Sequence, residues 1–129
     1  MNIPADLKYT ESDEWLKLDG DTAIIGITDY AQEHLSDVVY VEFPVAEGDE
    51  VVKGDAITTI ESVKAAAEVN APVGGAVIAV NEAVTKDTGS VNSDPFGVAW
   101  MVKIKVTDPS EVDAMMDAAA YEEYCAGRS

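Results

Sequence analysis

Lys64 is the residue whose surroundings point most clearly to chemistry. An expected strand at residues 57–60 leads into Glu61-Ser62-Val63-Lys64-Ala65, and a second expected strand follows at residues 67–70. This order places Lys64 at or near the tip of a hairpin, flanked by small residues, where a modifying enzyme can reach it. A group attached to its amine could swing there, and such a tether keeps a reactive group at high effective concentration near several active sites.

The residue types that most often perform catalysis are scarce. The sequence has one histidine (His34), one cysteine (Cys125) and one arginine (Arg128). Paired-histidine metal sites are therefore excluded, and a Cys–His pair would need a long-range contact between two distant positions. No glycine-rich phosphate loop precedes a helix. The sequence thus predicts neither a catalytic site nor a metal site, and any reactive group has to be attached to the chain.

Short strands separated by turn residues surround the lysine hairpin, which spans about residues 54–75. The pattern predicts a mainly β protein, a small antiparallel sandwich or barrel formed by a single domain over residues 1–129. Asp19-Gly20 is the expected turn of the first hairpin. The expected strands cover residues 14–18, 22–27, 38–43, 57–60, 67–70, 76–80 and 99–106.

Two helices are expected beside these strands. Asp29 is followed three residues later by Gln32, a spacing typical of a helix cap, so a short helix is expected at residues 30–35, after the second strand. Apolar residues recur at helical spacing near the end of the sequence, following Ser110 as a possible cap. They predict one C-terminal helix over about residues 110–124.

The chain is strongly acidic, with 25 Asp and Glu against 8 Lys and Arg and a formal net charge of −17. The electrostatic field of so many negative charges repels nucleic-acid phosphates and anionic membranes, so neither is an expected partner. Attraction to basic patches on partner proteins, solubility, and adaptation to a salty cytoplasm are three interpretations that the charge alone does not separate. No apolar run is long enough to cross a bilayer and the first residues do not form a secretory signal, so we expect a cytoplasmic protein. We expect a monomer, because no long apolar stripe is left over once the core is assigned.

The lysine segment resembles the lipoylation site of the glycine cleavage system H-protein family, and the resemblance extends over nearly the whole chain. One departure is Asp13, because the family usually has histidine before its Glu-Trp pair. Further segments similar to the family, in its order and spacing, are Leu7–Thr10, Glu14-Trp15, Gly26–Gln32, Asp37–Val41, Val80–Ala83, Val91–Pro95 and Tyr121 in the expected C-terminal helix.

This resemblance implies a lipoyl/biotinyl-carrier fold of the barrel-sandwich hybrid type and a carrier that performs no catalysis itself. Lipoate in amide linkage to Lys64 would accept an aminomethyl group from glycine on a pyridoxal-phosphate glycine decarboxylase. It would then pass that group to an aminomethyltransferase that uses tetrahydrofolate. A dihydrolipoyl dehydrogenase containing FAD would reoxidise the dithiol, and a lipoate ligase or lipoyltransferase would attach the cofactor.

The resemblance also implies a cleft into which the loaded arm folds. The matching positions are Ser12, Glu14, His34 and Glu68. A carboxylate there is chemically reasonable, because the carried aminomethyl group is a cation once protonated. Shielding the group from water would also slow its loss.

Three alternatives stay open at this point. A biotinyl carrier has the same hairpin, although biotin sites usually carry methionine on both sides of the lysine, where this chain has Val63 and Ala65. A lipoylated protein of another pathway, such as a relay that hands lipoate to 2-oxoacid dehydrogenase subunits or a carrier in sulfur chemistry, would have the same lysine segment. An enzyme that uses its carboxylates would keep its turnover in a Lys64→Ala variant.

Overall fold

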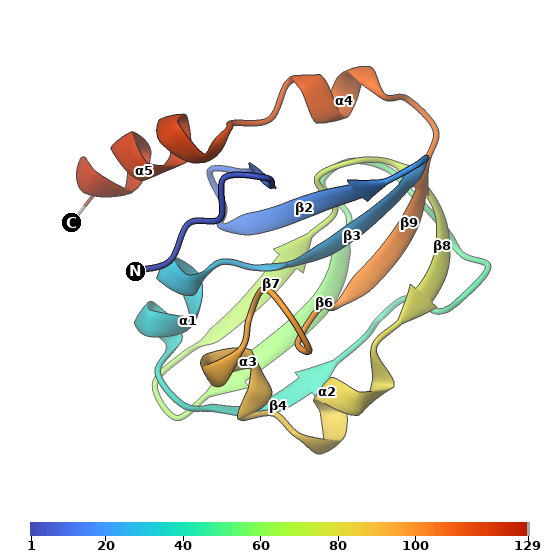
Figure 1. The fold of residues 1–129 in the computed structure, drawn as a ribbon. Coiled ribbons are helices and arrows are strands. Elements are labelled where there is room, and N and C mark those ends of the chain that lie inside the picture. Colours follow the sequence, from blue (N-terminus) through green and yellow to red (C-terminus); the bar gives the residue numbers. More distant parts are fainter. Residues whose placement is uncertain (129) are drawn as a thin grey trace.

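The computed structural model describes residues 1–128, which form two β-sheets (Figure 1). A six-stranded sheet has the order β1-β2-β3-β9-β8-β5, and a three-stranded sheet has the order β4-β6-β7. Every strand pairing among these residues is antiparallel, which confirms the predicted fold class. The strands are β1 (Lys8–Tyr9), β2 (Glu14–Asp19), β3 (Thr22–Ile27), β4 (Val38–Glu42), β5 (Glu50–Val51), β6 (Ala56–Ser62), β7 (Ala66–Asn70), β8 (Gly75–Val80) and β9 (Val102–Val106).

All seven predicted strands are present, but the two-residue strands β1 and β5 were not predicted, and β9 starts later than expected. Residues 99–106 were expected to be extended, but the strand begins at Val102. The Asn81 side-chain amide donates to the carbonyl oxygens of Val98 (2.8 Å) and Trp100 (2.7 Å). These bonds hold the preceding residues in a loop, a long-range effect that alternation of apolar and polar residues does not predict.

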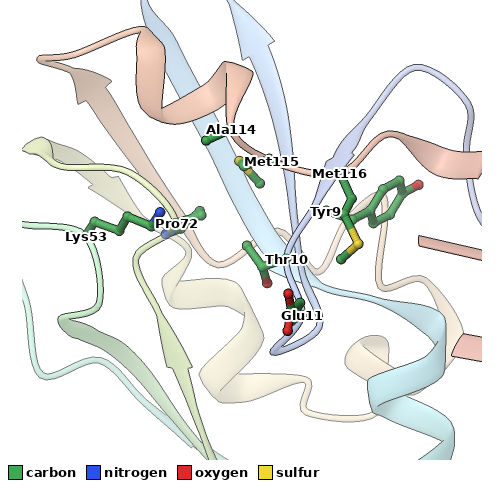
Figure 2. A pocket seen from close by; sticks show the side chains of 8 residues that line it. All are labelled: Tyr9, Thr10, Glu11, Lys53, Pro72, Ala114, Met115 and Met116. Carbon is green, nitrogen blue, oxygen red and sulfur yellow. The ribbon is translucent and has the colours of Figure 1, made fainter. Parts of the chain in front are cut away.

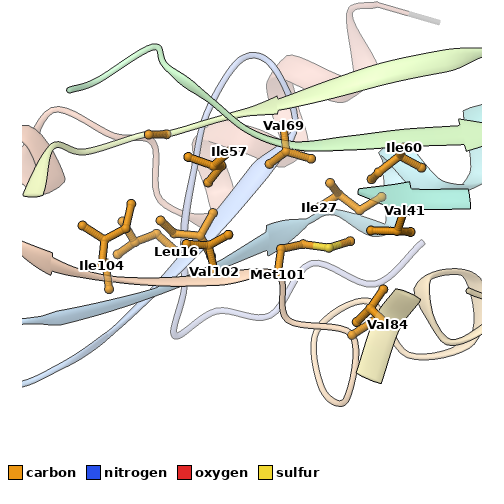
Figure 3. Packing of buried hydrophobic residues seen from close by; sticks show 14 of the residues in the cluster. Leu16, Ile27, Val41, Ile57, Ile60, Val69, Val84, Met101, Val102 and Ile104 are labelled. Carbon is orange, nitrogen blue, oxygen red and sulfur yellow. The ribbon is translucent and has the colours of Figure 1, made fainter. Parts of the chain in front are cut away.

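Apolar side chains from the inner faces of the two sheets meet in the main core (Figure 3). Leu16 and Ile104 of the larger sheet and Ile57, Ile60 and Val69 of the smaller one are each at most 2 % exposed. Successive side chains of a strand point to opposite faces, so the lysines on either side of Ile104 point away from the main core. Burial of this apolar surface is the main source of stability.

Three short helices lie between strands, α1 (Asp29–Leu35), α2 (Glu82–Lys86) and α3 (Ser90–Ser93). The predicted helix after the second strand is confirmed, but its cap is Thr28 rather than Asp29. The Thr28 hydroxyl accepts a hydrogen bond from the backbone N–H of Ala31 (3.2 Å). Asp29 lies within the first turn, where it accepts from the side chain of Gln32 (2.6 Å).

The C-terminal helix expected at residues 110–124 is instead two helices, α4 (Ser110–Asp113) and α5 (Ala118–Ala126). Between them Met116 pairs with Tyr9 of β1 through two backbone hydrogen bonds of 2.8 and 2.9 Å. This pairing needs extended backbone, so it interrupts the helix. Asp117 then caps α5 by accepting from the N–H of Ala120 (2.8 Å), whereas the predicted cap, Ser110, bonds only to Asp108 through its side chain.

Helix α5 packs against β1 and β2, on the side of the larger sheet that faces away from the main core (Figure 1). A second apolar cluster fills this contact, with Tyr9, Trp15, Tyr121 and Cys125 all buried. The rings of Tyr9 and Tyr121 stack at a centroid distance of 4.6 Å. The end of the described chain is therefore fixed beside the loop that joins β1 to β2.

Candidate functional site

Lys64 lies at the tip of the β6–β7 hairpin and is exposed, as the sequence predicted. Ser62 organises the turn, because its hydroxyl oxygen accepts from the N–H groups of Lys64 (3.2 Å) and Ala65 (2.9 Å). The Ser62 N–H donates to the carbonyl of Ala65 (2.8 Å). The turn is thus closed by three hydrogen bonds, and it carries an exposed lysine.

Exposed apolar side chains lie next to this tip. Val63 is 70 % exposed, and Val39 and Tyr40 of the neighbouring strand β4 are 55 % and 47 % exposed. The N–H of Val63 donates to the carbonyl of Asp37 (3.0 Å), which joins the tip to the segment leading into β4. An enzyme that reaches Lys64 therefore meets a surface made by both strands.

A cavity of about 180 Å³ lies between β7, α1 and the loop before β2. The structure brings together here all four residues that the resemblance indicated, Ser12, Glu14, His34 and Glu68. The remaining lining residues are Asp13, Ile27, Ala31, Leu35, Ile60, Ala67 and Val69. We call this cavity the cleft; six of its lining residues are apolar and three carry carboxylates, Asp13, Glu14 and Glu68.

The cleft follows β7, the edge strand next to the lysine turn. Its lining includes Ala67 to Val69, three to five residues beyond Lys64. At ~3.3 Å per residue these positions lie roughly 10 to 17 Å from Lys64 along the chain. The cleft is therefore within reach of a long group attached to the lysine amine.

Glu14 is the buried polar residue of the cleft, only 2 % exposed. Its Oε1 accepts from the hydroxyls of Thr10 and Ser12, each at 2.6 Å, and its Oε2 accepts from the backbone N–H of Asn70 (3.2 Å). Burial raises the pKa of this carboxyl above its ordinary value, and the three donors partly oppose that rise. A cation that entered the cleft would offset the cost of burying the ionised carboxylate.

The other three predicted residues are more exposed. Ser12 donates to Glu14 from the loop before β2. His34 lies on α1, where its ring stacks on Tyr30 at 4.2 Å and its Nδ1 is 2.9 Å from the Tyr30 carbonyl oxygen. Because a carbonyl oxygen only accepts, Nδ1 carries the proton in this bond. Glu68 is exposed on β7, opposite Thr59 of β6.

Three further residues that shape this site were not predicted from the sequence as part of it. Asn70 donates its backbone N–H to Glu14. Every residue except proline has such a group, so the residue type does not indicate this donor. Thr10 lies four residues before Glu14 and could have been suggested by that turn-like spacing. Asp13 lines the cleft with a left-handed backbone (φ 72°), which is uncommon for residues other than glycine.

A second cavity, of about 220 Å³, lies between β1 and the segment joining α4 to α5 (Figure 2). Its far side is formed by Lys53 and Pro72, which flank the base of the lysine hairpin, the end opposite Lys64. Within residues 1–128 no group of three or more His, Cys, Asp or Glu side chains is placed to hold a metal ion. No helix in the same range is long and apolar enough to cross a membrane.

A family model described as "Glycine cleavage H-protein" matches residues 7–128. The chain belongs to the glycine cleavage H-protein family. It is 49 % identical over 120 residues to the glycine cleavage system H protein of Parvibaculum lavamentivorans, covering 93 % of this chain and 95 % of that protein. It is 47 % identical over 120 residues to the mitochondrial H protein 2 of Arabidopsis thaliana, covering 93 % of this chain and 76 % of that protein.

The fold agrees with this family. The crystal structure of a glycine cleavage system H protein from Mycobacterium marinum superposes with a TM-score of 0.86 at 31 % identity, over 96 % of this chain and 99 % of that chain. The predicted membership of the H-protein family and the predicted carrier-type fold are both confirmed.

Proposed function

We propose that this protein is the lipoyl carrier of a glycine cleavage system and that the lipoyl group is attached to Lys64 by an amide bond. The observation that carries the proposal is the exposed Lys64 at the tip of a rigid hairpin, in a chain of the H-protein family. An exposed amine on a closed turn is accessible to a modifying enzyme. Membership of the family selects lipoate among the acyl groups that such an amine can carry.

The proposed reaction cycle uses three partner enzymes. A pyridoxal-phosphate glycine decarboxylase would release the carboxyl group of glycine as CO2 and transfer the aminomethyl group to one sulfur of the oxidised arm, whose disulfide would take up the two electrons left by decarboxylation. A tetrahydrofolate-dependent aminomethyltransferase would move the carbon to tetrahydrofolate with release of ammonia and leave the dithiol, which a FAD dihydrolipoyl dehydrogenase would reoxidise. The chain contributes no catalytic group to these steps, and its part is to present and protect the arm.

The cleft is the proposed resting place of the loaded arm. Lysine with a lipoyl chain has about 13 bonds in series of ~1.5 Å each, so its extended reach is comparable with the span from Lys64 to the far end of the cleft. The apolar walls suit its hydrocarbon part, and Glu14 suits the protonated aminomethyl group. Ser12, His34 and Glu68 also line the cleft and place further polar groups around the arm.

The proposal extends to the state of the protein in the cell. We expect one folded domain, a monomer, and a lipoate ligase or lipoyltransferase as the enzyme that attaches the cofactor. The cytoplasmic location stays a prediction, because bacterial relatives and mitochondrial relatives match the chain about equally well. Fractionation of the source cells followed by detection of the protein measures it directly.

Intact-mass measurement tests the attachment site. The protein is expressed in a lipoate-competent host beside Lys64→Ala and, as a matched control, Lys53→Ala, which removes another exposed lysine flanking the same hairpin. The parent and the control should gain the mass of one lipoyl group, and Lys64→Ala should gain none. An unmodified parent in the presence of active ligase and lipoate, or a modified Lys64→Ala protein, would refute the proposal.

Assays with partner enzymes separate the proposed pathway from its alternatives. With glycine and active glycine decarboxylase, the lipoylated protein should be reduced and gain an aminomethyl group, whereas a relay that serves 2-oxoacid dehydrogenases should not be loaded. Transfer of lipoate from this protein to a 2-oxoacid dehydrogenase subunit, without loading by glycine, would favour the relay. Capture of the native protein by streptavidin would favour a biotinyl carrier.

A further inference from the structure

Asp13 lies at a junction between the cleft and helix α5. Its side chain is 14 % exposed, and it accepts a bidentate ion pair from Arg128, with Nη1–Oδ1 2.5 Å and Nη2–Oδ2 2.9 Å. The Tyr121 hydroxyl also donates to its Oδ1 (2.8 Å). Paired bonds between guanidinium and carboxylate fix orientation as well as distance, so Asp13 is held more firmly than a surface residue.

The backbone of Asp13 is fixed as well. Its N–H donates to the carbonyl of Thr10 (3.2 Å), and its carbonyl accepts from the N–H of Thr28, the cap of α1 (3.0 Å). Its left-handed backbone is a conformation that persists only where surrounding contacts enforce it. The segment from Thr10 to Glu14, which supplies two of the three donors to the buried carboxylate and the carboxylate itself, depends on this turn.

Arg128 also contacts α1, the helix that supplies Ala31, His34 and Leu35 to the lining of the cleft. Its guanidinium lies over the ring of Tyr30 on α1 at 4.1 Å, and over the ring of Tyr124 at 4.7 Å. Tyr30 in turn stacks on His34, which lines the cleft. Arg128 is the sole arginine of the sequence, and it bonds to the loop before β2 while stacking on α1.

We propose that Arg128 and Asp13 act as a clamp that holds the Thr10–Glu14 loop and helix α1 at the separation required by the loaded arm. Both are positioning residues: they act on the arm through Glu14, Ser12 and His34. The role in protecting the arm rests on the proposed function, whereas the positioning of Glu14 does not. Through this clamp, the packing of α5 affects the shape of the cleft on the other side of the Thr10–Glu14 loop.

The positioning is tested on the unlipoylated chain by NMR. The Asn70 amide donates to the Glu14 carboxylate, so its proton signal reports whether that carboxylate is in place. In Arg128→Gln we expect this signal to lose the downfield shift that a bond to a carboxylate produces, together with changes at Ser12 and His34. Unchanged signals at these three positions, with changes confined to α5, would overturn the clamp.

A matched control separates positioning from simple loosening of α5. Asp117→Ala removes the cap at the other end of the same helix and has no contact with the cleft. It should lower the melting temperature by an amount similar to Arg128→Gln, yet leave the Asn70 signal in place. If Asp117→Ala moves that signal equally, the effect is general loosening and the clamp is refuted.

Arg128→Lys covers the case in which Arg128→Gln does not fold. Lysine keeps the positive charge but loses the bidentate geometry and the planar stacking. The same three signals should then move in the same direction by a smaller amount. No movement of these signals in a folded Arg128→Lys protein would refute the need for the guanidinium geometry.

The lipoylated variants test the functional part of the clamp. Attachment of lipoate should be unaffected, because Lys64 is distant from α5. The loaded arm of Arg128→Gln should lose its aminomethyl group faster, by a factor of about three to ten, the effect of weakening one charged hydrogen bond. Altered NMR signals with an unchanged rate of loss would refute protection in the cleft; a protein that cannot be lipoylated at all would refute the proposed function instead.

Discussion

The lysine tip and the cleft are built in opposite ways. The tip is local, since Ser62 closes its turn on residues at most three positions away and the surrounding side chains are exposed. The cleft is assembled from the loop before β2, the end of β3, α1, β6 and β7. Its central carboxylate, that of Glu14, takes a donor from Asn70, 56 residues away.

This difference between the lysine tip and the cleft predicts how each of them responds to substitutions. A modifying enzyme needs an accessible lysine on a defined turn, and a short segment can supply it. A resting place for a reactive cation needs low exposure and converging donors, and only a folded core supplies these. Substitutions at the tip should therefore alter modification with little cost in stability, whereas substitutions at the cleft should affect stability, protection of the arm, or both.

The largest expected contrast lies within one hairpin. Ile60 of β6 is fully buried in the main core and lines the cleft, whereas Val63 at the tip is 70 % exposed. Ile60→Ala should lower the free energy of unfolding by roughly 2 to 5 kcal/mol, because it leaves a cavity in packed surroundings. Val63→Ala should change it by less than about 0.5 kcal/mol. Urea unfolding of both variants measures the contrast, and equal losses would contradict it.

A smaller effect is expected from the charge of Glu14. Glu14→Gln keeps the size of the side chain and removes its charge, so lipoylation should proceed normally. The loaded variant should lose its aminomethyl group about tenfold faster, because the carried cation no longer meets a carboxylate. Release of formaldehyde from the loaded protein, in the absence of the aminomethyltransferase, measures the rate. A rate equal to that of the parent would remove Glu14 from the proposed resting place.

Glu14 also makes stability depend on pH in a defined direction. Burial raises the pKa of its carboxyl in the folded protein, so over a range above about 4.3 the folded state binds a proton that the unfolded state has lost. The contribution of Glu14 to stability is therefore fully present below that pH and declines as the pH rises through the folded pKa. Between pH 4 and 7 the parent should thus lose stability relative to Glu14→Gln, and the opposite trend in urea unfolding would contradict the raised pKa.

A small effect on stability and on lipoylation is expected at Ser62. Ser62→Ala removes the side-chain acceptor for two N–H groups of the turn but leaves the backbone bond to Ala65. Both groups are at the surface, where water replaces the lost bonds, so stability should fall by no more than about 1 kcal/mol. Lipoylation by the ligase should slow severalfold because Lys64 is presented by a looser turn. An unchanged initial rate would show that the enzyme reshapes the turn itself.

Much of the fold follows from patterns within short segments. β-Branched and aromatic residues predict β4, alternating apolar residues predict β9, and the turn at Asp19-Gly20 predicts the first hairpin of β2 and β3. The lysine tip is predicted for the same reason, since a strand, a short polar turn and a second strand follow one another in the sequence. The four cleft residues came from the resemblance to the family rather than from spacing.

Two local predictions were wrong at positions where contacts distant in sequence decide the backbone. The C-terminal helix is divided because Met116 pairs with Tyr9, a partner more than one hundred residues away. Strand β9 starts late because the Asn81 amide holds the two carbonyl groups before it. Helical spacing and alternation were both present in these segments, but hydrogen bonds to other elements outweighed them.

The sequence by itself determined the family, through segments that recur along nearly the whole chain, and most strands and the lysine on its turn, because each of these is encoded within a few adjacent residues. Only the tertiary structure decided that Glu14 is buried with three donors and that Asp13 is paired with Arg128. Burial and pairing depend on which segments the core brings together, and two carboxylates one residue apart look alike in the sequence. Folding gives one a position inside the cleft and the other an ion pair at its edge.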